Sequence, residues 1–348
     1  MRRSDCSGPG LRRTRRGRGF VYLDERGQRI EDPETLARLR ALAIPPAWQE
    51  VWICPDPNGH LQATGIDAAG RKQYLYHSRW REHRDRQKFA KALRFGASLP
   101  KLRRRVAVDL AGDPLSKEQV LACAARLLDV GMFRIGGEEY ADEDGGFGLA
   151  TIRREHVSVR GDAVEFDYPG KGGARRLQVI EDPVSHGVVS GLKRRRGGGE
   201  ELLAYRNRRR WHPVRSEEIN EYLKASLGED FSAKDFRTWN ATVMAAVSLA
   251  SADAQATSKS SRKRLIDRAV REVAELLGNT PAVARRAYID PRVFDRYLSG
   301  WTIADALKGL PPLAAANDRA RRRIERAVLT LLDEPDGRGA GTASKSRR

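Results

Sequence analysis

The sequence predicts an α+β protein, in which a small N-terminal antiparallel β-sheet domain precedes a larger, mainly α-helical domain with a three-stranded β insert. Three observations support this fold class. Runs rich in β-branched and aromatic residues surround turn sequences before residue 80, and apolar residues recur three and four positions apart after it. Near residue 160, a group of short alternating runs interrupts the helical pattern.

The N-terminal sheet is predicted from extended runs separated by turns. These runs lie at residues 20–23, 51–54, 60–64 and 72–77. The second and third flank a Pro-Asp-Pro-Asn-Gly sequence that ends at Gly59, which indicates a hairpin. In the last run Tyr74 and Tyr76 share one face, because side chains alternate along a strand.

The second domain is predicted from helical periodicity and one β interlude. Helical patterns cover residues 80–95, 99–110, 117–130, 216–227, 232–252, 261–277, 280–298 and 317–332. The interlude has strand patterns at 156–159, 163–168 and 176–180, joined by Gly-containing turns. We therefore expect a flexible basic arm at 1–19, the sheet domain at 20–90, the helical domain at 91–333 and a flexible tail at 334–348.

The composition indicates an anionic partner. Lys and Arg number 65 against 46 Asp and Glu, a formal net charge of +19, which favours nucleic acid, with general surface basicity as the alternative. Three separated cysteines and six histidines show no metal-ligand or disulfide spacing, so we expect no metal. Since no apolar run could serve as a signal-peptide core or membrane span, we expect a cytoplasmic protein.

Tyr288 lies on a basic segment that begins at Gly278 and includes Arg285 and Arg286. A phenol is a poor nucleophile at its free pKa of about 10. A tyrosine that attacks phosphorus therefore needs neighbouring positive charge, which favours phenolate and stabilises the transition state.

Four positions before Tyr288 could supply such contacts. Arg134 follows an apolar helix at a Gly-rich bend, where complementing the helix dipole is the alternative role. Lys171 is at a glycine-bordered hairpin tip, or is simply a turn lysine. Arg237 opens a long apolar helix and suits phosphate contact or a structural salt bridge. Asn279 lies at a junction of two helices, where it could equally be a helix cap.

Taken together, these motifs resemble the type IB DNA topoisomerases, specifically the small bacterial and poxvirus-like members. The resemblance includes Ile-Pro-Pro-Ala-Trp at 44–48, Gly-Arg-Lys-Gln-Tyr at 70–74, Phe-Arg-Ile-Gly at 133–136, Gly-Lys at 170–171, Lys-Asp-Phe-Arg-Thr at 234–238, Gly-Asn-Thr-Pro at 278–281 and Ala-Tyr at 287–288. The departure is Asn279, where poxvirus and eukaryotic members carry histidine. Asparagine can still donate a hydrogen bond to a phosphate oxygen, but it carries no charge.

This resemblance implies a mechanism and a set of roles. Tyr288 would attack a phosphorus in duplex DNA to give a covalent 3′-phosphotyrosine, and Arg134 and Arg237 would bind the non-bridging oxygens. Asn279 would add a neutral hydrogen bond, and Lys171 would protonate the leaving 5′-oxygen. The fold would be that shared by tyrosine recombinases and type IB topoisomerases.

The resemblance also implies the partners. Duplex DNA would be bound by a monomer, with Arg71, Lys72, Tyr74 and Tyr76 of the sheet domain and Tyr140 of the helical domain as contacts, although packing is the alternative role for the tyrosines. Strand swivelling and religation would relax supercoils without ATP, and the sequence has no G-x-x-x-x-G-K-[ST] phosphate loop. We expect no cofactor.

The sequence alone leaves two other functions open. Tyrosine recombinases share the nucleophile but usually carry His-x-x-Arg, and here Lys234 takes the place of that histidine before Arg237. A non-catalytic basic DNA-binding protein would have the same charge. The mutation Tyr288→Phe separates this alternative from an enzyme, because it would leave a pure binder unchanged.

Overall fold

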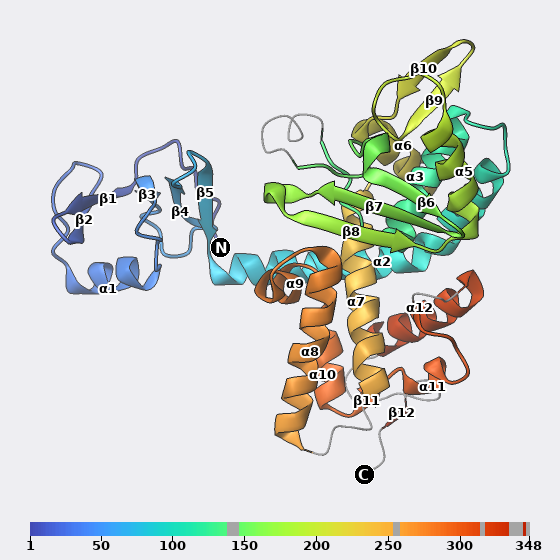
Figure 1. The fold of residues 1–348 in the computed structure, drawn as a ribbon. Helices are drawn as coiled ribbons and strands as arrows, with labels where there is room; N and C mark the ends of the chain where they lie inside the picture. The colour runs from blue at the N-terminus through green and yellow to red at the C-terminus, as the bar shows by residue number, and fades with distance from the viewer. Residues whose placement is uncertain (138–145, 253–257, 314–316, 334–343, 346–348) are drawn as a thin grey trace. The chain divides into compact units, whose positions relative to one another are not determined.

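The computed structural model describes residues 1–137, 146–252, 258–313, 317–333 and 344–345 (Figure 1). The chain forms two compact units, Met1–Lys88 and Phe89–Arg348. We describe each unit by itself, and we call them the N-terminal unit and the catalytic unit.

The N-terminal unit is a five-stranded antiparallel sheet with one helix. The strands follow the spatial order β2-β1-β3-β4-β5. Their bounds, with the helix, are β1 Leu11–Arg16, β2 Gly19–Leu23, α1 Pro33–Ala41, β3 Gln49–Ile53, β4 Leu61–Ile66 and β5 Lys72–Tyr76. A small core that includes Leu39, Ile53 and Ala63 fills the space between the helix and the sheet. The predicted N-terminal antiparallel sheet is therefore confirmed.

Strand β1 corrects our prediction of a flexible arm over residues 1–19. It lies inside the sheet, paired with both β2 and β3. Its Arg13 is buried and donates hydrogen bonds to the carbonyl oxygens of Ile44 at 2.7 Å, Pro45 at 2.8 Å and Trp48 at 3.0 Å. A guanidinium carries five donors, and here three carbonyls accept from its Nη1 and Nη2, so an arginine-rich run can form a central strand. These bonds also fix the Ile-Pro-Pro-Ala-Trp turn.

The catalytic unit is mainly helical. Its helices are α2 Ser78–Leu110, α3 Lys117–Gly131, α5 Pro183–Arg194, α6 Ser216–Leu227, α7 Ala233–Ala252, α8 Lys259–Leu277, α9 Pro281–Ala287, α10 Arg292–Leu298, α11 Ala304–Leu307 and α12 Asp318–Asp333, with α2 beginning in the N-terminal unit. Helix α7 is the central element, since Phe236 and Trp239 are fully buried and α3, α8, α10, α11 and α12 all contact it. Figure 1 shows α8 and α12 on opposite sides of α7.

The predicted β insert is present as an antiparallel sheet of order β6-β7-β8. The strands are β6 Val157–Arg160, β7 Ala163–Pro169 and β8 Arg175–Ile180, and the short 3-10 helices η1 Arg154–His156 and η2 Lys171–Gly173 adjoin them. A two-stranded hairpin, β9 Ala204–Asn207 with β10 Arg210–Pro213, and helices α1 and α5 were not predicted.

Three further predictions about element boundaries are wrong. The predicted helices at 80–95 and 99–110 form one helix of 33 residues, in which Pro100 is tolerated. The predicted helix at 280–298 is two helices, α9 and α10, because Pro291 lacks a donor and disfavours helical backbone at the residue before it. In the predicted flexible tail, β12 Ser344–Lys345 pairs with β11 Trp301–Thr302, and the remainder of that tail lies outside the described residues.

Candidate active site

A pocket of about 460 Å³ in the catalytic unit brings together residues from five separate segments. Arg134, Lys171, Arg237 and Asn279 all line it. They come from the loop after α3, the β7–β8 hairpin, the first turns of α7 and the junction of α8 with α9. The four positions selected from the sequence therefore meet at one site.

Arg134 lies just beyond the end of α3. Met132 adopts a left-handed conformation with φ of 57° and turns the chain out of the helix. The backbone N–H of Leu149 then donates to the carbonyl of Arg134 at 2.8 Å. A Cβ added to Gly148 would lie 2.4 Å from the backbone nitrogen of Gly136, so the two segments can pass this closely only as glycines. The Gly-rich bend thus fixes the position of Arg134.

Asn279 sits in the turn that joins α8 to α9. Gly278 has φ of 59°, and the N–H of Asn279 donates to the carbonyl of Ala274 at 2.9 Å, which closes helix α8. The side-chain Oδ1 of Asn279 accepts a hydrogen bond of 2.7 Å from Nη2 of Arg134. Its Nδ2 is buried and has no hydrogen-bond partner among the described residues. Asn279 therefore helps to close helix α8, and its amide nitrogen is left without a partner among the described residues.

Arg237 is 4% exposed and holds two helix ends together. Its Nη1 donates to the carbonyl of Met132, at the end of α3, and its Nη2 donates to that of Leu277, at the end of α8, at 2.7 Å. Its Nε has no partner in the described parts of the chain. Burial first, and then the charge of Arg134, lower its pKa to about 10. No carboxylate forms an ion pair with it among the residues described, so the predicted alternative of a salt bridge is absent there.

Tyr288 lies directly against Arg237. It is half-buried at the C-terminus of α9, and its backbone N–H donates to the carbonyl of Ala284 at 3.0 Å. The guanidinium carbon of Arg237 lies 5.3 Å from the centre of its ring. Burial alone would raise the pKa of the phenol, but the charges of Arg237 and Arg134 outweigh it and lower that pKa below its usual value. The two guanidinium groups therefore make Tyr288 easier to ionise than a free tyrosine.

Lys171 occupies the exposed rim of the pocket. It is the first residue of η2, between β7 and β8, where Gly172 and Gly173 have φ of 73° and 74°. The N–H of Phe147 donates to the carbonyl of Pro169 at 2.8 Å, which ties the hairpin to the segment that pairs with Arg134. The predicted hairpin-tip position is confirmed, and Lys171 is among the residues that line the pocket.

Arg176 is a pocket residue that the sequence did not single out. Its Nη1 and Nη2 donate to the carbonyls of Glu275 and Leu276 at 3.1 and 2.6 Å, which joins β8 to the end of α8. A Cβ on Gly278 would lie 2.5 Å from its Nη1. In the sequence Arg175-Arg176 is simply a basic pair in a strand, and no local signal distinguishes it from a solvated pair.

The predicted DNA contacts of the N-terminal unit share one exposed face of the edge strand β5. Tyr74 and Tyr76 are 47% and 37% exposed, with their ring centres 6.2 Å apart and nearly parallel. Nζ of Lys72 lies 6.0 Å from the centre of the Tyr74 ring. Arg71 precedes the strand and pairs with Asp67 at 3.1 Å. Their contact with DNA stays a prediction, and Tyr140 lies outside the described residues.

Two further findings concern the described residues as a whole. Within them, no group of three or more His, Cys, Asp or Glu side chains could hold a metal ion. No helix in the same set is long and apolar enough to cross a membrane.

Comparison with known proteins gives two family matches. Residues 77–303 match the model for the catalytic core of eukaryotic DNA topoisomerase I, and residues 19–67 match that for the N-terminal domain of bacterial DNA topoisomerase IB. The first match contains every residue of the pocket described above.

Individual relatives agree with these matches. DNA topoisomerase 1B of Acanthamoeba polyphaga mimivirus is 28% identical over 288 residues, which cover 80% of this chain and 85% of the relative. DNA topoisomerase 1B of vaccinia virus (strain Copenhagen) is 20% identical over 245 residues, 66% of this chain and 70% of the relative. DNA topoisomerase 1 of Schizosaccharomyces pombe is 30% identical over 160 residues, 45% of this chain but only 19% of that longer protein.

The catalytic-core match covers well over half of the chain, and the bacterial N-terminal match covers most of the sheet before it. The chain therefore belongs to the type IB DNA topoisomerases, which are isomerases, and it resembles their small bacterial and poxvirus-like members.

Proposed function

We propose that this chain relaxes supercoiled duplex DNA by transient cleavage of one strand through a 3′-phosphotyrosyl intermediate on Tyr288, without ATP or a metal ion. The observation that carries the proposal is the set of unpaired donors in the pocket. Arg134, Arg237 and Asn279 are held by backbone and by one another, and the phenol of Tyr288 lies against the same guanidinium. A phosphodiester would satisfy donors that the described residues leave open.

In the cleavage step, Oη of Tyr288 attacks the phosphorus and forms a P–O bond, while the bond from phosphorus to the 5′-oxygen breaks. Negative charge on the non-bridging oxygens is met by the guanidinium groups of Arg134 and Arg237 and by the amide of Asn279. Each preorganised guanidinium contributes about 10²–10³ in rate, and the neutral amide contributes less, about 2- to 10-fold. Because these side chains are fixed before DNA arrives, little reorganisation is needed during the reaction.

Lys171 donates a proton to the departing 5′-oxygen. An alkoxide is a poor leaving group, so a positioned acid contributes on the order of 10²–10⁴ in rate. Lys171 is exposed at a hairpin tip bordered by glycines. This position supports the role, because its ammonium group is free to move with the departing 5′-oxygen. The same lysine would take the proton back during religation.

One phosphodiester is exchanged for another of similar energy, so religation needs no nucleotide. Between the two steps the free 5′ end swivels about the intact strand, and a single subunit is enough for this cycle. We therefore propose that the enzyme acts as a monomer. Lys72, Tyr74 and Tyr76 would contact the backbone of the bound duplex from the N-terminal unit, and Arg71 would contribute less because Asp67 already pairs with it.

A relaxation assay tests this proposal. Negatively supercoiled plasmid is incubated in EDTA without ATP, with the wild-type protein and with Tyr288→Phe. We expect ladders of relaxed topoisomers from the wild type alone, and DNA binding by both. Relaxation by Tyr288→Phe would remove Tyr288 as the nucleophile, and relaxation that requires Mg²⁺ or ATP would contradict the chemistry.

A further inference from the structure

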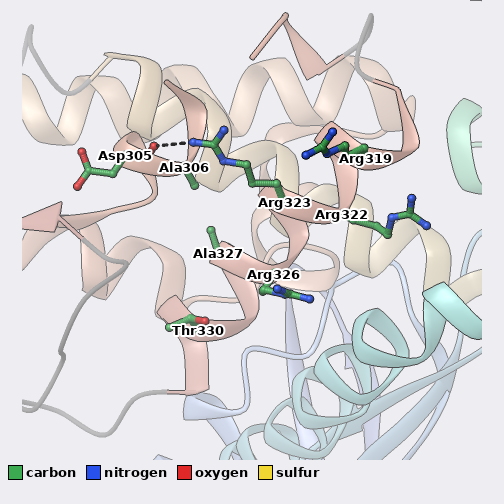
Figure 2. A pocket seen from close by; sticks show the side chains of 8 residues that line it. All are labelled: Asp305, Ala306, Arg319, Arg322, Arg323, Arg326, Ala327 and Thr330. Atoms are coloured by element: carbon green, nitrogen blue, oxygen red, sulfur yellow. Dashed lines mark hydrogen bonds between the residues drawn. The ribbon is translucent and has the colours of Figure 1, made fainter. Parts of the chain in front are cut away.

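Arginines line two pockets of the catalytic unit, and they are held differently in each. In the pocket between α11 and α12, four arginines of α12 line the wall, and Arg323 donates a hydrogen bond of 3.3 Å to the carbonyl of Asp305 (Figure 2). In the active-site pocket, Arg176 of β8 donates hydrogen bonds of 3.1 and 2.6 Å to the carbonyls of Glu275 and Leu276. Because both of its Nη atoms are held, Arg176 has a fixed place in the site.

The hydrogen bonds of Arg176 complete the C-terminal end of α8. The last carbonyls of a helix have no donor within the helix, and positive charge beside them is stabilising. Arg237 of α7 takes the next carbonyl, that of Leu277, at 2.7 Å. Two guanidinium groups therefore take three consecutive carbonyls, from Glu275 to Leu277. The end of α8 is held by both β8 and α7, two residues before Asn279.

Two glycines leave space for the side chain of Arg176. A Cβ on Gly170 would lie 2.7 Å from its Cγ, and a Cβ on Gly278 would lie 2.5 Å from its Nη1. Gly170 has φ of −89°, which any residue can adopt, so its small size is what matters there. These glycines immediately precede Lys171 and Asn279. The side chain of Arg176 therefore passes close to the backbone of two segments that carry site residues.

The site residues belong to two parts of the catalytic unit. Arg237 joins the ends of α3 and α8, and Asn279 follows α8 directly. Lys171 instead lies on the β7–β8 hairpin. Arg176 follows Lys171 by five residues in this hairpin, and it links the hairpin directly to the end of α8. The separation between Lys171 and the proposed phosphate contacts therefore depends on Arg176.

We propose that Arg176 is a positioning residue for the general acid of the cleavage step. By holding the hairpin against the end of α8, it places Nζ of Lys171 beside the 5′-oxygen. The proton passes from that Nζ to the oxygen as the P–O bond breaks. Both Nη atoms of Arg176 are bonded to carbonyls, so this side chain acts through the fold and does not supply the proton. The inference rests on the proposed function, because it requires Lys171 to be the acid.

A change of leaving atom tests this role. Two duplexes are compared, and in one of them sulfur replaces the bridging 5′-oxygen at a cleavage site mapped with the wild-type enzyme. A thiol has a pKa of about 8.5, so the sulfur leaves as a thiolate without an acid. The oxygen of the normal duplex needs one. An enzyme whose acid is misplaced should therefore cleave the oxygen duplex slowly and the sulfur duplex normally.

The main variant is Arg176→Met, which removes the donors and keeps much of the side-chain length. Single-turnover cleavage of the oxygen duplex at saturating DNA should slow about 10- to 100-fold, because a displacement of about 1 Å can cost about 10²-fold. Cleavage of the sulfur duplex should stay within about threefold of wild type, since it needs no acid. Arg176→Lys keeps a charged donor and should slow the oxygen duplex less than Arg176→Met does.

Two further variants are measured on both duplexes. Arg175→Met is the matched control: Arg175 is the neighbouring residue of β8, lies on the opposite face of the strand, is exposed and pairs with Asp167 at 2.6 Å. It should cleave both duplexes as the wild type does. Lys171→Ala removes the acid itself, so it should show the pattern of Arg176→Met with a larger loss on oxygen. Normal cleavage of the sulfur duplex also shows that a variant is folded.

The outcomes separate this inference from the proposed function. If sulfur restores cleavage by Lys171→Ala but not by Arg176→Met, the inference alone is overturned, and Arg176 acts on the phosphate charge or on the fold. Wild-type cleavage of the oxygen duplex by Arg176→Met would overturn it equally. If sulfur does not restore cleavage by Lys171→Ala, the acid assigned in the proposed function is wrong, and the inference is overturned with it.

Discussion

Two buried arginines of the catalytic unit, Arg103 and Arg237, meet opposite kinds of partner. Arg103 of α2 donates four hydrogen bonds of 2.7–2.9 Å to the carboxylates of Asp129 and Glu325. Arg237 of α7 donates to two backbone carbonyls and faces the ring of Tyr288. The charge of Arg103 is neutralised within the fold, while that of Arg237 has no carboxylate partner among the described residues.

The pKa values of the two groups express this difference. Burial works to lower the pKa of Arg103, but its two carboxylate partners outweigh burial and raise it. Burial and the nearby charge of Arg134 lower the pKa of Arg237 to about 10. The two sets of partners are also adjacent along the chain, since Asp129 lies three residues before Met132, whose carbonyl binds Arg237. We infer that the ion pairs of Arg103 hold the end of α3 in place. Arg237 is in turn positioned by its hydrogen bond to that end of the helix.

The largest expected effect is on stability, from breaking the ion pairs of Arg103. Arg103→Met leaves two buried carboxylates without their main partner, and we expect it to lower the free energy of unfolding by about 3–5 kcal/mol. Urea denaturation measures this change. Arg104→Met, at the exposed neighbouring position, is the matched control and should stay within about 0.5 kcal/mol of wild type. Equal stability of the two variants would show that Arg103 is not structural.

The next largest effect is expected on the cleavage rate, when the charge of Arg237 is removed. Arg237→Ala should slow single-turnover cleavage about 10²–10³-fold, because a preorganised donor to the transition state is lost. It should cost less stability than Arg103→Met, because no buried carboxylate is left unpaired. Rapid-quench measurement of cleavage at saturating DNA gives the rate. A loss of less than tenfold would mean that Arg237 serves the fold alone.

A smaller effect is expected at Asn279. Its Nδ2 would make one neutral hydrogen bond to phosphate, which contributes about 0.5–1.5 kcal/mol, so Asn279→Ala should slow cleavage about 2- to 10-fold. Asn279→Asp should be slower than Asn279→Ala, because a carboxylate would repel the phosphate. Asn279→His, which restores the residue of poxvirus and eukaryotic members, should keep the rate. If Asp and Ala gave equal rates, Asn279 would not contact the phosphate.

The smallest effect is expected at Lys234, an exposed residue whose charge helps to lower the pKa of Tyr288. Lys234→Gln should raise that pKa, so the rise of the cleavage rate with pH should move to a higher pH. The measurement is the pH profile of single-turnover cleavage, with Arg104→Gln as the charge control. A rising limb that stays at the wild-type pH would contradict a role for Lys234 in lowering the pKa of Tyr288.

Short sequence patterns predicted the turns and strands that depend on interactions between residues close together in the chain. Strand alternation and the Asn58-Gly59 turn predicted the β3–β4 hairpin, and the glycines after Lys171 predicted the tip of the β7–β8 hairpin. The sequence also indicated the four candidate site residues, because each is a cationic or amide side chain predicted at a helix end or a turn. Their convergence into one pocket follows from tertiary packing, which the sequence alone did not provide.

For three arginines that the sequence analysis did not place correctly or did not single out, partners distant in the sequence decide the outcome. Arg13 can be buried in a central strand only because carbonyls from residues 44–48 meet its guanidinium. Arg176 and Arg103 look like solvated cations until α8 and α12 are placed beside them. Helix α2 continues through Pro100, although the sequence there suggested two helices.

The central claim is that the unpaired cations activate Tyr288 for a covalent step, and trapping the adduct tests it most directly. The enzyme is incubated in EDTA with a duplex that releases a short fragment 3′ of the cleavage site, and the protein–DNA adduct is digested with trypsin and analysed by mass spectrometry. We predict one modified peptide, with the 3′-phosphate of the DNA on Tyr288. Linkage to a 5′-phosphate, linkage to another residue, or an adduct from Tyr288→Phe would contradict the account.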